Sequence, residues 1–161
     1  MNRCVCIPFY LLPLLVLLSA CGAEPVYHPG LATAAEAAQR IETLEGAAPE
    51  DSTAAQALLR AYAEFGNHHR SDDRTAEFLF RRALGLSRAG KARMAVMQWS
   101  DVYDGFPAYA RRADCVFWVA FLSENELNDL DRAEKAYLLL LEEHPNSRFA
   151  EAARDALIAL P

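Results

Sequence analysis

The most constraining feature of this 161-residue chain is a spacing pattern that occurs twice, 38 residues apart. Each copy has a small residue, an aromatic residue at +4, an aliphatic residue at +7 and a proline at +12. The copies are Ala95, Trp99, Val102 and Pro107, then Ala133, Tyr137, Leu140 and Pro145. Residues four and seven apart share one face of an α-helix, and proline cannot continue a helix. Each copy therefore predicts a helix with one packed face and a fixed end.

A second small residue precedes each copy. Ala83 lies 12 residues before Ala95, and Ala120 lies 13 residues before Ala133. Small residues on two consecutive helices let the backbones approach closely, and the larger residues of the pattern then fill the space toward the next pair. The pattern predicts helical hairpins that stack on one another.

Helical periodicity continues over most of the chain from Thr33 onward, and no segment favours a strand. The expected helices cover about residues 33–45, 52–65, 73–88, 92–104, 109–124, 131–144 and 147–160. Residues typical of helix ends flank them: capping boxes at Thr33–Glu36 and Asp131–Glu134, a cap at Ser147, and terminating glycines at Gly66 and Gly90. The expected fold class is all-α, with about seven helices.

This arrangement resembles the tetratricopeptide repeat, whose units are helical hairpins of about 34 residues. The positions that carry the resemblance are Ala83, Ala95, Trp99 and Pro107, then Ala120, Ala133, Tyr137 and Pro145. A degenerate third copy, with Leu58, Tyr62 and Phe65, precedes them. The chain departs from the family in its longer spacing and in having alanine where the family has glycine on the first helix. The resemblance implies a short tetratricopeptide-like array, and the alternative is a general helical bundle.

The last repeat has a further likeness. The stretch from Ala133 to Ala153, including Glu143-His144-Pro145-Asn146-Ser147, is similar to the repeats of outer-membrane envelope lipoproteins. These include the β-barrel assembly lipoprotein of the BamD type and the Tol-Pal-associated periplasmic repeat protein. The similarity covers about residues 54–161 and rests on scaffold positions. It implies a role in envelope assembly or maintenance without naming a partner.

The N-terminus resembles a bacterial lipoprotein signal. Arg3 precedes an apolar run, and Leu18-Ser19-Ala20-Cys21 is similar to a lipobox. Cleavage is expected between Ala20 and Cys21, with lipid attached to Cys21. The alternative is an uncleaved transmembrane anchor, against which stand the short length of the run and its two prolines.

The predicted cleavage divides the chain into three parts. These are a signal peptide (1–20), the lipidated Cys21 with a Pro/Gly-rich tether (21–32), and a repeat domain (33–161). Loss of Arg3 takes the number of Lys and Arg from 16 to 15 against 22 Asp and Glu, which gives a net charge of −7. An acidic chain without basic clusters is poorly suited to bind nucleic acid or anionic lipid. The membrane contact is therefore expected through the lipid alone. Lipoproteins retained in the inner membrane of enteric bacteria have Asp after the lipidated Cys. Gly22 is at that position here, which favours a location on the periplasmic face of the outer membrane.

Few residues suggest chemistry. The sequence lacks the common metalloprotease, hydrolase and phosphate-loop motifs. His68 and His69 could be metal ligands, but a solvated loop is the simpler interpretation. Cys115, in an apolar helical run, is expected to be a buried, inert thiol. We expect no catalytic residues, no metal and no cofactor other than the covalent lipid.

A peptide groove is the functional feature that the repeat resemblance implies. In the family, the first helix of each hairpin lines a concave surface. The corresponding positions are Glu77, Phe80, Leu84 and Ser87, then Asp114, Phe117, Phe121 and Glu124. An apolar strip flanked by carboxylates would suit a peptide with apolar anchors and a few Lys or Arg. The alternative is that these residues are ordinary core.

Three functions follow from these expectations. The first is a membrane-anchored periplasmic scaffold that binds envelope proteins or their peptide segments. The second is a ligand- or peptide-binding lipoprotein that serves a transport system. The third, remote, is an envelope enzyme with an unrecognised site.

The lipid anchor can be tested by replacing Cys21. Because the acidic domain has no electrostatic attraction to lipid, Cys21→Ala should move the protein from the membrane fraction to the soluble fraction. Cell fractionation and immunoblotting measure this, with Cys115→Ala as a control that should remain at the membrane. Full membrane retention of Cys21→Ala would contradict the lipobox.

Overall fold

The computed structural model describes residues 28, 30, 32–48 and 52–161, and these residues form helices and no strand. The helices are α1 (Ala34–Ala47), α2 (Ser52–His68), α3 (Thr75–Arg88), α4 (Ala92–Gly105), α5 (Arg112–Asn125), α6 (Leu130–Glu143) and α7 (Ala150–Ala159). The predicted all-α array of seven helices is confirmed. Residues 1–20, including Ala20, and Cys21 with most of the tether, lie outside the described residues.

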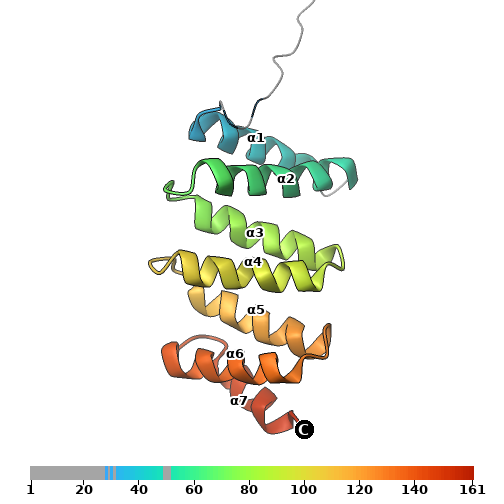
Figure 1. The fold of residues 1–161 in the computed structure, drawn as a ribbon, viewed down its shortest axis with the longest axis vertical. Helices are drawn as coiled ribbons and strands as arrows, with labels where there is room; N and C mark the ends of the chain where they lie inside the picture. The colour runs from blue at the N-terminus through green and yellow to red at the C-terminus, as the bar shows by residue number, and fades with distance from the viewer. Residues whose placement is uncertain (1–27, 29, 31, 49–51) are drawn as a thin grey trace, which may run out of the picture.

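The helices stack in chain order along the long axis of the molecule, from α1 at one end to α7 at the other (Figure 1). Each helix packs chiefly against the helices that precede and follow it in the chain. The array is therefore a single layer of hairpins, the geometry expected of a helical repeat.

The repeat positions lie at the centre of this packing. All four alanines of the two hairpins are fully buried, as are Trp99, Val102 and Leu140, and Tyr137 is nearly so. Pro107 and Pro145 lie in the turns after α4 and α6. The buried residues of α3–α7 form one continuous core, and a smaller cluster joins α1, α2 and the start of α3.

Gly66 has a different role from the one expected. The predicted helix end there is wrong, because α2 continues to His68 and buries Gly66. A Cβ at Gly66 would lie 2.7 Å from Cδ2 of Leu79 on α3. The glycine thus permits close approach of α2 and α3 rather than ending α2.

Two other helix ends behave as predicted. Thr33 and Glu36 form a reciprocal capping box at α1, in which the Thr33 N–H donates to Glu36 Oε2 over 2.8 Å. After α3, Gly90 has a φ of +69°, and its N–H donates to the Ser87 carbonyl. Lys91 N–H donates to Leu86, which completes a Schellman motif.

Two predicted caps are wrong. Asp129, not Asp131, caps α6 by accepting from the Arg132 N–H over 3.2 Å. The residue before this cap, Asn128, has a left-handed backbone conformation with a φ of 51°. Ser147 uses its carbonyl, not its side chain, to accept from the N–H of Ala150, and α7 begins without a side-chain cap.

None of the described helices has the combination of length and apolar content needed to cross a bilayer.

The close approach of the helices predicts how the fold responds to added volume. Ala120→Leu should lower the free energy of unfolding by about 1–3 kcal/mol, because Ala120 is fully buried where α5 meets its neighbours. Ala152→Leu, on the exposed side of α7, is the matched control and should change it by less than about 0.5 kcal/mol. Urea unfolding followed by circular dichroism measures both. Equal effects would contradict the packing argument.

Candidate functional site

A continuous series of ion pairs links the first helices of the hairpins. We call it the charge ladder, and its members in spatial order are Glu45, Arg81, Glu77, Arg111, Asp114 and Arg148. Successive pairs are separated by 2.9, 2.8, 3.4, 3.0 and 2.7 Å between nitrogen and oxygen. The ladder connects α1, α3, α5 and the turn before α7. Because several charges interact at once, such a network stabilises more than an isolated surface pair.

Tyrosine hydroxyls hydrogen-bond the carboxylates of this face, one from α2 and one from the connection between α4 and α5. Tyr109 donates to Oε2 of Glu77 over 2.6 Å, and Tyr62 donates to Glu45. Burial, followed by the hydrogen bond to Glu77, raises the pKa of Tyr109. Burial alone would raise the pKa of Glu77, but the hydrogen bonds from Tyr109 and Arg81 and the charge of Arg111 outweigh it and lower the pKa.

The ladder occupies the carboxylates that were expected to flank a peptide groove. Glu77 contacts Arg81 and Arg111. Asp114, only 8% exposed, contacts Arg111 and Arg148. The charges expected to attract Lys or Arg of a partner are already neutralised by the protein's own arginines.

The remaining groove positions do not form one surface. Phe80 is fully buried under the guanidinium of Arg111, whose Cζ lies 3.8 Å from the ring centroid. Leu84 is half-buried and lines a separate cavity between α1, α2 and α3. Glu124 is half-buried and accepts from the Tyr137 hydroxyl over 2.8 Å.

An aromatic cluster on α5 and in the turn before α7 includes one exposed ring. Phe117 stacks on Phe149, with ring centroids 4.0 Å apart and nearly parallel rings. Trp118 packs edge-on against Phe121, which is 39% exposed. Trp118 also stacks on the buried Trp99, so the cluster is anchored in the core. An exposed aromatic ring held by such packing is typical of a contact surface.

Two arginines of the ladder, Arg111 and Arg148, belong to a repeated sequence pattern that the sequence-based predictions did not use. The pattern is Arg, any residue, Ala and an acidic residue. It occurs three times at intervals of 37 residues, beginning at Arg74, Arg111 and Arg148. Each arginine lies just before or at the start of α3, α5 or α7. Arg111 and Arg148 each reach the acidic residue of the preceding repeat. The repeat is visible in the sequence, but its pairing across hairpins is not.

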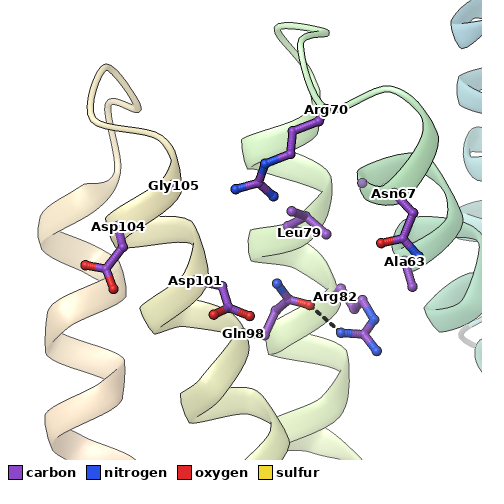
Figure 2. A pocket seen from close by; sticks show the side chains of 10 residues that line it. Ala63, Asn67, Arg70, Leu79, Arg82, Gln98, Asp101, Asp104 and Gly105 are labelled. Carbon is purple, nitrogen blue, oxygen red and sulfur yellow. Dashed lines mark hydrogen bonds between the residues drawn. The ribbon is translucent and has the colours of Figure 1, made fainter.

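A polar cleft of about 590 Å³ lies between α2, α3 and α4 (Figure 2). Arg70, in the loop before α3, and the half-buried Arg82 line one side, whereas Asp101 and Asp104 project from α4. Arg82 donates to the Leu59 carbonyl over 3.2 Å and to Gln98. Burial lowers the pKa of Arg82. The cleft offers charges of both signs to a small polar ligand.

The remaining candidates for metal binding or catalysis, His68, His69 and Cys115, belong neither to the charge ladder nor to the lining of the polar cleft. Among the described residues, no three His, Cys, Asp or Glu side chains are grouped as a metal site would require. His68 is exposed at the end of α2, and the His69 ring packs 5.0 Å from Phe65. Cys115 is fully buried, and burial raises the pKa of its thiol to about 12. That thiol stays protonated at neutral pH and is a poor nucleophile.

No protein-family model matches the chain, and no curated protein matches it significantly.

The charge ladder predicts a pH-dependent contribution to stability. The ordinary pKa of 4.5 for Glu77 is lowered in the fold, so its charged form stabilises the protein above about pH 4.5 and ceases to do so as the pH falls through the lowered pKa. Glu77→Gln should therefore lower the free energy of unfolding by about 1 kcal/mol at pH 7 and by much less at pH 3.

Urea unfolding at the two pH values measures this difference. Glu134→Gln, at an exposed position on α6, is the matched control and should have little effect at either pH. A loss for Glu77→Gln that is equally large at pH 3 would show that the charge of Glu77 is not the cause.

Proposed function

We propose that this protein is a membrane-anchored interaction scaffold on the periplasmic side of the cell envelope, where it binds another envelope protein. The observation that carries the proposal is the single-layer stack of hairpins. Because each described helix packs chiefly on its chain neighbours, much of the helix surface is left for contact with a partner. Helical repeats use such extended surfaces to bind proteins.

The aromatic cluster on α5 supports binding on the side that carries the charge ladder. Phe121 is exposed there, and Phe117, Trp118 and Phe149 fix its surroundings. The ladder holds successive hairpins in register, so this side presents a preorganised surface. A rigid surface loses less conformational entropy on binding.

The location in the envelope rests on the sequence. The lipobox-like residues that end at Cys21 support a lipid anchor, and Gly22 supports the outer membrane. The similarity of the last repeat to envelope lipoproteins supports a role in envelope assembly or maintenance.

A second candidate function is binding of a small polar ligand on behalf of a transport system. The observation that favours it is the polar cleft at Arg70, Arg82, Asp101 and Asp104. Its mixed charges would suit a zwitterion. A thermal-shift screen of small zwitterions tests it, with Arg82→Gln expected to abolish any shift.

The scaffold function can be tested by photo-crosslinking in the native envelope. A photoreactive residue at Phe121 in the full chain should give one dominant adduct with another envelope protein, identified by mass spectrometry. The same residue at Lys135, exposed on α6, is the control and should not give this adduct. If neither position, nor any other exposed position on the seven helices, crosslinks to a protein, the scaffold function is wrong.

A further inference from the structure

The polar cleft lies at the junction of α2, α3 and α4, and the next junction along the array, between α4, α5 and α6, is built on the same repeat. Corresponding residues lie 37 positions apart from α2 to α4 and from α3 to α5, and 38 apart from α4 to α6. Each residue that lines the cleft therefore has a counterpart at the second junction. Three pairs that differ in size or polarity are Gly66 and Tyr103, Arg82 and Val119, and Asp101 and Leu139.

At the second junction, the side chain of Tyr103 spans the space that corresponds to the cleft. Tyr103 is only 9% exposed, and its hydroxyl donates to Glu143. Glu143 corresponds to Gly105, which lines the cleft. At the first junction, glycine thus stands at both positions, and a cleft of about 590 Å³ remains. This volume falls within the range of about 300–1,000 Å³ typical of binding sites.

The aromatic side chains of this fold have recurring partners. Each of the four tyrosines that the structure describes donates its hydroxyl to a glutamate. The pairs are Tyr62 with Glu45, Tyr103 with Glu143, Tyr109 with Glu77, and Tyr137 with Glu124. Arginines lie over rings as well, since the Cζ of Arg112 is 4.1 Å from the ring centroid of Tyr103. Contacts between helices here combine an aromatic ring, an arginine and a carboxylate.

The cleft has the arginines and the carboxylates of this combination, but among the described residues that line it none is aromatic. Arg70 and Arg82 lie on one side and Asp101 on the other (Figure 2). Within the part of the chain that the structure describes, these three side chains take part in no ion pair, and the Asp101 carboxylate accepts no hydrogen bond. The site therefore lacks the ring that its counterpart contains.

The charges of the lining are balanced. Arg70 and Arg82 stand against Asp101 and Asp104. All lining residues belong to the range 52–161, which the structure describes without a gap, and none of them is next to an undescribed residue. A neutral group with a hydrogen-bond donor can thus enter without leaving an excess of charge of either sign.

We propose that the polar cleft binds a tyrosine side chain of the partner protein. The ring packs on Leu79 within reach of the guanidinium groups of Arg70 and Arg82, and the hydroxyl donates to the carboxylate of Asp101. The inference rests on the proposed scaffold function and names an anchoring residue of the partner. Tyrosine is enriched among the residues that dominate binding energy at interfaces, because it joins a large apolar area to a polar end.

The second junction favours tyrosine over other occupants of the cleft. There the same side chain, with an arginine over its ring and a carboxylate at its hydroxyl, already spans the corresponding space. A phenylalanine would leave the Asp101 carboxylate without a donor. A lysine or a glutamate would pair with one sign of charge in the lining and be repelled by the other.

The first test measures binding of N-acetyl-tyrosinamide to the full chain, as cells produce it, in nanodiscs of zwitterionic lipid. Saturation-transfer NMR should show saturable binding, and N-acetyl-phenylalaninamide, which lacks the hydroxyl, should bind at least fivefold more weakly. Empty nanodiscs give the lipid background. No saturable binding of the tyrosine amide, or equal binding of the two amides, overturns the proposal. Equal or tighter binding of glycylglycine, a small zwitterion without a ring, also overturns it.

Substitution of Asp101 tests the contact with the hydroxyl. Asp101→Ala should weaken binding of the tyrosine amide at least fivefold and leave binding of the phenylalanine amide unchanged. Asp155→Ala, at an exposed position on α7, is the matched control and should change neither. An equal loss for both amides would show that the Asp101 carboxylate does not accept from the hydroxyl, which contradicts the proposed geometry.

A second variant fills the cleft from within. Gly66→Tyr with Leu79→Val copies Tyr103 and Val116 of the second junction, and it removes the leucine that a Cβ at Gly66 would meet at 2.7 Å. The double variant should abolish binding of the tyrosine amide, whereas Leu79→Val alone should retain it. Circular dichroism verifies that both are folded. Unchanged binding in a folded double variant would show that the amide binds elsewhere.

A photoreactive residue at Asn67, an exposed position that lines the cleft, locates the natural occupant in the native envelope. An adduct on a partner segment that contains a tyrosine, and that is lost in the double variant, supports the proposal. An adduct on a segment without tyrosine overturns it. If crosslinking at Phe121 captures an envelope protein while the cleft experiments fail, only the cleft proposal is wrong. If crosslinking fails at Phe121 and at the other exposed positions too, the scaffold function is also wrong.

Discussion

The close approach of consecutive helices at four buried alanines is the contact on which the array depends. Ala83, Ala95, Ala120 and Ala133 have no exposed surface, and they lie where α3 to α6 pack on one another. A larger side chain at these positions would separate the backbones. Trp99 and Tyr137 then fill the space between hairpins, and both are almost completely buried. Glycine has the same role between α2 and α3, where Gly66 faces Leu79.

The charge ladder acts on top of this packing. Burial supplies most of the stability of a helical array, but apolar packing alone leaves the relative rotation of hairpins weakly specified. The ladder adds directional contacts from each hairpin to the next, since Arg111 joins Glu77 to Asp114 and Arg148 continues to α7. Buried or half-buried carboxylates are tolerated there because arginine and tyrosine satisfy them.

The same ladder changes which surface can bind a charged partner. The carboxylates of Glu77 and Asp114 pair with arginines in the fold. The face that carries them therefore has little attraction for cations.

The sequence by itself determined the helices, their order and the two principal hairpins. Helical periodicity and the spacing of alanine, aromatic residue and proline are local properties, so a single chain is enough to predict them. The Thr33 cap and the Gly90 turn were predicted for the same reason. The lipobox-like pattern that ends at Cys21 is likewise a linear pattern, so the lipid anchor stays a prediction that lies outside the described residues.

Only the tertiary structure decided which side chains meet across hairpins. Gly66 was predicted to end a helix, but it lies inside α2, where it permits the close approach of Leu79 from α3. The cap of α6 is Asp129, two residues before the predicted Asp131, and it follows Asn128, whose φ of 51° is left-handed. Glu77 and Asp114 were candidates for the edge of a peptide groove, with ordinary core as the alternative, and in the fold arginines 34 residues further along the chain reach them. The physical reason is that pairing over such separations depends on the rotation and spacing of packed helices, which a local spacing rule does not contain.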